Sequence, residues 1–538
     1  MREKRVSVVV LIAVAVVAFF LRAHHIGYPP IGYHSMKEVH YLSVAKGYMD
    51  HGDFLHKRVL YSGLSSGPGY IEGFPQFQFL PLIYFALWKV FGVHVWIARF
   101  VVILFSLGTI VFVYKVCREL GGSEEVSLLA SVFMSIMPIS VFFGRNVQPD
   151  AVALFFILIS HYFFLKWAAG FSARHLFYFS LGLFMAAIVK ATFLFLVIPV
   201  LFVFPYGMMA EPHIRRKIYK QMIVLAPAPV LVFLWLLFTK SLLTAGGTLI
   251  PFDRMLLPES FTLAYWRVRF PIIWKYIGEN YTFVYFSFFV VSLFWCALNF
   301  KMRLSKYIIG SAVTALLYFL LISDFAARHS YYHFPFLPMV CIGLATVLSE
   351  GVDVIRFDKR RYLKYVILAA IILLTAPSVK GNIDKHFDKL MLGTDVAGRY
   401  IRERGLPSDR IFISYGSPSD TRFAGYRTQF YGTLWEAGRR GALLPADLEK
   451  LQFCEKELGF RWIVFYKTDW IGADRHILNY ITDTYSIVQA GFKEDELLYY
   501  LLLKGGKVDL GRVNDIEKQF VERYEFSFGH IDVYVKEP

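Results

Sequence analysis

The sequence predicts a polytopic α-helical membrane protein that carries a small α/β domain at its C-terminal end. Of the 538 residues, 56% are hydrophobic and only 18% are charged, a composition typical of polytopic membrane proteins. Apolar segments long enough to cross a bilayer, about eleven in all, recur up to residue 379. Beyond that point, short strand-like runs alternate with charged helical stretches. We therefore expect a transmembrane domain over residues 1–379 and a soluble α/β domain over residues 380–538.

The expected spans are apolar runs of roughly 17 to 25 residues. They lie near residues 6–22, 97–116, 124–142, 150–167, 174–189, 191–206, 221–239, 281–299, 306–323, 334–350 and 364–379. The first run follows a basic N-terminus, and no small-residue cleavage site follows it. We therefore interpret it as a retained membrane anchor.

The distribution of charge predicts the orientation of these spans. The formal net charge is +16, and the excess lies before residue 380, where 34 Lys and Arg face 17 Asp and Glu. Basic loops between alternate spans fall on the same side as the basic N-terminus, which the positive-inside rule makes cytoplasmic. An odd number of spans then places residues 380–538 outside the cytoplasm. Because the excess sits in short membrane loops, it argues against nucleic acid as a partner.

One apolar stretch, residues 74–92, is excluded from the spans. If it crossed the membrane, every later basic loop would lie on the outer side. We therefore expect residues 24–95 to form a large outer loop, with interfacial helices at about 36–50 and 76–91.

The C-terminal domain is predicted from strand-like runs at residues 410–415 and 461–466 and from a closing strand at 527–535. Helical stretches at 395–405 and 446–458 alternate with them. Strands alternating with helices predict a largely parallel sheet.

Unusual polar residues gather at the outer ends of the expected helices. An acid, an amine and imidazoles crowd the stretch from His34 to Tyr41, just past the first span. Such groups are costly beside lipid, so they predict a polar cavity. The positive-inside rule predicts few cations on the outer side, so the cations found there argue for a bound anion. Phosphate is a suitable anion because both Arg and Lys bind it. The cations are Lys37, Arg145, Lys190 and Arg328.

Each of these residues also has a structural interpretation. Lys190 could snorkel from a helix end, and Arg145 could pair with Asp150, which could instead cap a helix. The adjacent Tyr331 and Tyr332 suit an interfacial aromatic belt. His329 and His333 could be structural, and Glu38 could lie on a solvated face. Their convergence on one side of the membrane favours a site.

The order of these residues resembles the C-type glycosyltransferase superfamily, which holds protein O-mannosyltransferases and the lipid A aminoarabinose transferase. The family's Asp-Glu-x-x-Tyr motif corresponds to residues 37–41, where Lys37 replaces the first Asp, and a Gly-Asp pair follows at 52–53. Arg145, the Gln-Pro-Asp run at 148–150 and Lys190 match as well. The runs at 34–38 and 329–332 resemble a subgroup with a His-x-Trp-Arg-Gln loop motif and a later His-x-Tyr-Tyr motif.

The resemblance implies a polyprenyl-phosphate sugar as the donor. An inverting hexosyl or pentosyl transfer to a glycan, lipid or protein acceptor would pass through an oxocarbenium-like transition state. The site residues fall into three groups. The candidate general bases are Glu38 first and Asp150 second. The candidate phosphate ligands are Lys190, Arg328, Arg145, Lys37 and His329. The candidate pocket residues are His34, His40, Tyr41, Tyr331 and Tyr332.

The predicted sugar transfer requires no cofactor. A divalent cation such as Mn²⁺ or Mg²⁺ could bridge Glu38, Asp150 and His34, although no spacing signature demands one. The alternative function is a lipid or solute transporter or flippase with an outer accessory domain. Transporters place polar residues near the bilayer midplane, whereas here the charges gather at helix ends. The sequence therefore favours a membrane enzyme, surrounded by lipid, that uses a lipid-linked substrate.

Overall fold

The computed structural model describes residues 2–54, 59–61, 77–241, 257–353, 361–414, 431–466 and 474–538. The chain divides into two compact units, which are described separately here. The helical unit comprises Met1–Ile26, Gly73–Leu80 and Ala98–Lys385. The sheet unit comprises Gly27–Glu72, Pro81–Ile97 and His386–Pro538. Much of the predicted first outer loop thus shares a unit with the C-terminal residues, and the division at residue 379 stays a prediction.

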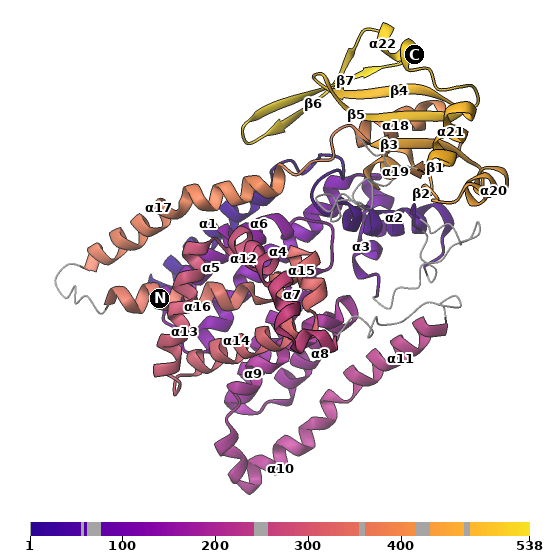
Figure 1. Ribbon diagram of the computed structural model, residues 1–538. Helices are drawn as coiled ribbons and strands as arrows, with labels where there is room; N and C mark the ends of the chain where they lie inside the picture. The colour runs from indigo at the N-terminus through magenta and orange to yellow at the C-terminus, as the bar shows by residue number, and fades with distance from the viewer. Residues whose placement is uncertain are drawn as a thin grey trace. The chain divides into compact units, whose positions relative to one another are not determined.

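The helical unit is built from α-helices and short 3₁₀ helices, the latter labelled η (Figure 1). The elements up to residue 261 are α1 (Arg2–Ala23), α4 (Val95–Glu119), α5 (Glu124–Ile136), α6 (Pro138–Phe143), α7 (Asp150–Gly170), α8 (Ala173–Val189), η1 (Ala191–Val197), α9 (Ile198–Phe202), η2 (Tyr206–Ala210), α10 (Pro212–Gln221), η3 (Met222–Leu225), α11 (Pro227–Ser241) and η5 (Pro258–Phe261). The remaining elements are α12 (Leu263–Tyr281), α13 (Phe283–Leu298), α14 (Arg303–Leu321), α15 (Ser323–Arg328), η6 (Ser330–Phe336), α16 (Leu337–Asp353) and α17 (Arg361–Phe387).

Within the described ranges, seven helices are long and apolar enough to span a membrane, or eight if α12 and α13, bent by 100°, form one span. The protein is therefore a multi-pass membrane protein. The sequence predicted about eleven spans, and the difference lies in three places. The expected span at 124–142 breaks at Pro138, which cannot continue helix α5. Helix α8 and the η1–α9 segment, which meet at Lys190, are both short apolar helices. These three segments account for the difference. Helix α3 (Phe79–Phe91), with 13 residues, is shorter than a span, in line with the exclusion of residues 74–92 from the expected spans.

The break between α5 and α6 is held by Arg22, near the end of α1. Its guanidinium is completely buried, and all five of its N–H donors have an acceptor. The acceptors are the Ser106 hydroxyl at 2.9 Å, the Ala18 carbonyl at 3.0 Å, the Ser135 carbonyl at 3.0 Å, the Met134 carbonyl at 3.3 Å and the Ser140 hydroxyl at 2.7 Å. The two carbonyls in the last turn of α5 would otherwise lack donors. Gly144 leaves room for this group, since a Cβ there would lie 2.7 Å from Arg22 Nε.

We expect the Arg22→Met substitution to lower the free energy of unfolding by about 3 kcal/mol, because it leaves buried acceptors without donors. Unfolding by SDS titration, followed by far-UV circular dichroism, measures the change. The matched control is Arg303→Met, which removes an exposed arginine from the start of α14. Equal stability of the two variants would contradict the structural role of Arg22.

The sheet unit contains one mixed sheet and the helices that cover it (Figure 1). Its helices are α2 (Ser35–His51), most of α3, α18 (Thr394–Arg404), α19 (Tyr431–Ala437), α20 (Leu448–Leu458), α21 (Arg475–Thr484) and α22 (Leu510–Asp515). Its strands are β1 (Arg410–Ile413), β2 (Gly441–Leu443), β3 (Phe460–Tyr466), β4 (Tyr485–Lys493), β5 (Glu496–Lys504), β6 (Gln519–Phe526) and β7 (Gly529–Lys536). The strand order is β2-β1-β3-β5-β4-β7-β6.

The prediction of a largely parallel sheet is wrong. Only β1 pairs in parallel, with β2 and β3, and the four other pairings are antiparallel. The reason is two hairpins that the sequence reading missed: β4 turns into β5 through Glu494, which adopts a positive φ of 51°, and β6 turns directly into β7. The predicted helices at 395–405 and 446–458 and the strands at 461–466 and 527–535 are confirmed. The strand at 410–415 is present as β1, and its last residue lies outside the described residues.

Helices at 36–50 and 76–91 are confirmed as α2 and α3. Within the sheet unit, Val39 of α2 and the preceding Ile31 belong to one buried cluster with Val396 and Ile401 of α18. Gly432 of α19 permits this close approach, because a Cβ at that position would lie 2.9 Å from Ile31 Cγ2. The helix that carries the predicted acidic motif is therefore fixed to the fold of the C-terminal residues.

Candidate active site

The centre of the candidate site in the helical unit is a buried ion pair between Asp150 and Lys190. Asp150 is the first residue of α7, and Lys190 is the extended residue between α8 and η1. The Lys190 Nζ lies 2.6 Å from Asp150 Oδ1, and the two side chains are 8% and 2% exposed. Lys190 thus contacts a carboxylate in the protein interior and does not extend toward water. Burying both charges is costly and by itself weak evidence for stability.

Two tyrosine rings complete the surroundings of the Lys190 ammonium group. Its Nζ lies 4.8 Å from the ring centroid of Tyr331 and 4.9 Å from that of Tyr332, both on η6. The His329 ring stacks on Tyr331 at 5.3 Å. Such cation–π contacts stabilise a desolvated cation. Five predicted site residues therefore come together here, and the ammonium group is held in place before any ligand binds.

The two predicted arginine ligands make other contacts. Arg145 is buried and donates to the backbone carbonyls of His24 and, at 3.1 Å, His25, just past the end of α1. Arg99 donates to the Ile26 carbonyl at 3.0 Å. Arginines beside the C-terminal end of a helix interact favourably with its dipole. Arg328 pairs with Asp324 at 3.0 Å, and its side chain is 59% exposed. A phosphate contact by Arg145 or Arg328 stays a prediction.

Two further polar side chains near this cluster are buried. Gln148, two residues before Asp150, is 1% exposed, and His333, directly after Tyr332, is 1% exposed. Within the part of the chain that the structure describes, neither the Gln148 amide nor the His333 ring nitrogens have a hydrogen-bond partner. Buried polar groups are usually satisfied, so these are candidates to bind a polar ligand. Both positions stand out in the sequence, but neither was predicted to be a site residue.

The acidic motif lies in the sheet unit, on α2. Glu38 is 4% exposed in the first turn of this helix, and Tyr41 is 6% exposed. His34 precedes the helix in a left-handed conformation with a φ of 60°, and the ring of His40 lies edge-on to that of Tyr41 at 5.4 Å. Lys37 is half-buried.

Helix α3 places the Tyr84 hydroxyl beside this motif. Burial raises the pKa of Tyr84 well above its usual value, and the charges of Tyr41 and Glu38 raise it further. The Glu38 carboxylate therefore lies close to a completely buried phenol. Glu38 thus sits in an environment fixed by α2 and α3 rather than on a solvated helix face.

The predicted residues accordingly form two groups, one in each unit. Among the described residues, no group of three or more His, Cys, Asp and Glu side chains is placed to hold a metal ion. The predicted bridge from Glu38 through Asp150 to His34 draws its ligands from both units.

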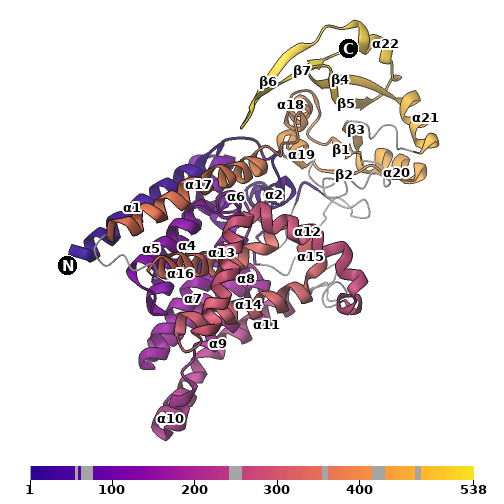
Figure 2. The ribbon, with the colours of Figure 1, turned by 60° about the vertical axis from the view of Figure 1, so that its left-hand side comes forward.

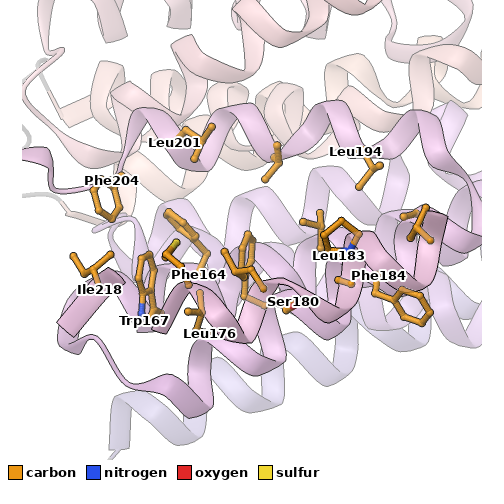
Figure 3. Close-up of a pocket in the computed structure, with 18 of the residues that line it drawn as sticks. Phe164, Trp167, Leu176, Ser180, Leu183, Phe184, Leu194, Leu201, Phe204 and Ile218 are labelled. Atoms are coloured by element: carbon orange, nitrogen blue, oxygen red, sulfur yellow. The ribbon is translucent and has the colours of Figure 1, made fainter. Parts of the chain in front are cut away.

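An apolar cavity of about 690 Å³ adjoins the Lys190 segment in the helical unit (Figure 3). Its lining comes from α7 to α11 with the intervening η1, η2 and η3, and it is almost wholly apolar. Ala187 and Leu194, three residues before and four residues after Lys190, both line the cavity. Figure 3 shows Leu194 toward one end of the lining and Trp167, Phe204 and Ile218 at the other. Along α8 the lining runs from Leu176 to Ala187, about 16 Å at the helical rise. The volume is in the range of small-molecule sites.

Comparison with known proteins identifies the class of this fold. The family model described as dolichyl-phosphate-mannose-protein mannosyltransferase matches residues 12–268. The oligosaccharyltransferase AglB from Archaeoglobus fulgidus, in complex with an inhibitory peptide and a dolichol-phosphate, is similar with a TM-score of 0.56 and 11% identity, over 92% of this chain and 74% of that chain. ArnT from Cupriavidus metallidurans bound to undecaprenyl phosphate is similar with a TM-score of 0.51 and 15% identity, over 98% and 97%. An AglB structure with Zn and sulfate has a TM-score of 0.54 and 13% identity, over 93% and 73%.

The chain therefore has the fold of the C-type membrane glycosyltransferases, as its motifs predicted. Within this class, its first half matches the mannosyltransferase family model. No curated protein sequence matches the chain.

Proposed function

We propose that this protein transfers a sugar from a polyprenyl-phosphate donor to an acceptor. The observation that carries the proposal is a preformed buried ammonium group, that of Lys190, in a segment whose residues Ala187 and Leu194 line an apolar cavity. A ligand that suits both features has an anionic head and a long apolar chain. Polyprenyl phosphates have this chemistry, and the similar AglB and ArnT structures hold dolichol-phosphate and undecaprenyl phosphate.

In this proposal Lys190 stabilises the charge that grows on the departing phosphate. The ammonium group has three donors, so it can bind a phosphate oxygen while it keeps its hydrogen bond to Asp150. Because the group is held by Asp150 and by two tyrosine rings, it needs little reorganisation during the reaction. Gln148 and His333 are available to bind sugar hydroxyls.

The acceptor's nucleophilic atom attacks the anomeric carbon in line, as the bond from that carbon to the phosphate oxygen breaks and the configuration inverts. The acceptor's proton goes to a carboxylate. Asp150 already accepts a hydrogen bond from Lys190, so we favour Glu38 as the base. The transferred sugar is a hexose or a pentose, and the acceptor is a glycan, a lipid or a protein.

The proposal is tested with purified protein in detergent. Synthetic polyprenyl-phosphate sugars, offered with a mixture of acceptors, should release free polyprenyl phosphate, whereas the same sugars carried by a nucleotide diphosphate should not react. No turnover of any lipid-linked sugar, together with movement of such a lipid across liposome membranes, would instead support the transporter reading.

The cavity makes a separate prediction about tail length. The Ser180→Trp substitution introduces a large side chain into the lining, so we expect it to raise the KM for a long-chain donor at least 10-fold. The KM for a donor with two isoprene units should change little. Leu181→Trp, on the adjacent and 44% exposed residue of α8, is the matched control. If Ser180→Trp raised the KM equally for the long-chain and the short-chain donor, the donor tail would not lie in this cavity.

We further propose that the N-terminus is cytoplasmic and that the C-terminal residues are extracytoplasmic. The four native cysteines are buried, so introduced cysteines report on topology. A membrane-impermeant maleimide applied to intact cells should label Lys507→Cys, where the native side chain is 77% exposed, and should not label Lys217→Cys on α10. The reverse pattern would invert the proposed orientation.

A further inference from the structure

Helix α10 presents a dense group of cations to solvent. Its exposed residues include Arg215, Arg216, Lys217 and Lys220, four cations within six positions. Over the described parts of the chain, none of the four has a carboxylate within salt-bridge distance, and the ion pair recorded for this segment joins His213 to Glu211. Figures 1 and 2 both show α10 at the edge of the helical unit. This cationic group is therefore open to a ligand.

Other residues of α10 line the apolar cavity. Ile218 is 4% exposed and lines the cavity together with Tyr219 and, in η3, Met222. Figure 3 shows Ile218 beside Phe204 and far from Leu194, at the end remote from Lys190. One short helix thus combines exposed cations with an apolar wall of a cavity.

We propose that the α10 end of the cavity binds an anionic phospholipid of the surrounding membrane, with the headgroup on the α10 cations and an acyl chain in the cavity. The almost wholly apolar lining selects a hydrocarbon chain, and the unpaired cations select an anionic head. Helix α10 directly precedes the apolar part of the candidate span Pro212–Phe238, so its cations lie where juxtamembrane basic residues meet headgroups.

This site is distinct from the general cationic bias of inner loops. Such a bias needs no cavity and no fixed position of the cations. The proposal does not rest on the function proposed for Lys190, because it concerns the other end of the cavity and needs no reaction.

The test uses the full-length protein in nanodiscs of phosphatidylcholine with a small fraction of phosphatidylglycerol, followed by native mass spectrometry of retained lipid. We expect phosphatidylglycerol to be retained in preference to phosphatidylcholine. In the triple variant R215Q/R216Q/K217Q its affinity should fall about 100-fold, since each juxtamembrane cation contributes about fivefold. The matched control is K301Q/R303Q/K306Q, which removes one cation from the connection between α13 and α14 and two from the first turn of α14, and which should retain the lipid.

Three outcomes would overturn the proposal. Equal losses in the two triple variants would mean that only bulk charge attracts the lipid. Displacement by millimolar glycerol phosphate or inorganic phosphate would mean an anion site that does not use the cavity. Displacement by an equimolar polyprenyl phosphate with two isoprene units, whose tail is too short to fill the cavity from the Lys190 end, would assign the α10 end to the donor instead. The melting temperature of each variant in phosphatidylcholine alone shows whether it is folded.

Discussion

The Lys190→Met substitution is expected to lower the rate of sugar transfer by about 10²- to 10³-fold, because it removes the cation that we propose stabilises the departing phosphate. The same change leaves the Asp150 carboxylate buried without its partner, which costs roughly 3 to 5 kcal/mol of stability. Activity and stability must therefore be measured together, by release of polyprenyl phosphate and by unfolding in SDS.

A double substitution separates the two effects. In D150N/K190M both charges are gone, so we expect stability to return close to that of the native protein while activity stays low. If the double variant recovers transfer along with stability, the ion pair is structural and Lys190 does not act on the phosphate.

The Glu38→Gln substitution is expected to lower the rate constant for transfer by about 10²- to 10⁴-fold, the usual contribution of a positioned general base. The amide keeps the shape of the buried side chain but cannot accept the acceptor's proton. A pH profile of kcat should lose its acidic limb in this variant, a change that a purely structural defect would not produce.

The matched control for Glu38 lies on the same helix. Asp50 has a 47% exposed side chain that pairs with Lys46, so Asp50→Asn should leave transfer and its pH profile unchanged. Full activity of Glu38→Gln would reassign the base to Asp150. Loss of activity in both variants with unchanged pH profiles would indicate a folding defect in α2.

The sequence predicted correctly those features that depend on neighbours along the chain. Helices at 36–50 and 76–91 were found because apolar runs and charge distribution are local properties. Lys190 was singled out because a cation at an outer helix end conflicts with the positive-inside rule, and Asp150 because it is a carboxylate among the polar residues at the outer helix ends. Prediction from the sequence failed where one local pattern is compatible with more than one structure. The expected span at 124–142 contains Pro138 and breaks there, and the alternating elements after residue 380 fold into hairpins as well as parallel pairs.

Composition and hydropathy alone predicted a multi-pass membrane protein, and the order of its polar residues resembles the motifs of the C-type glycosyltransferases. Only the tertiary structure decided which charges meet. Lys190 pairs with a carboxylate 40 residues away, and Arg22, the last residue of the first expected span, binds groups 84 to 118 residues distant. The cavity likewise needs α7 to α11 assembled around it. Hydropathy and charge are properties of each residue and can be taken from the sequence directly, whereas ion pairs and cavities depend on how distant segments pack.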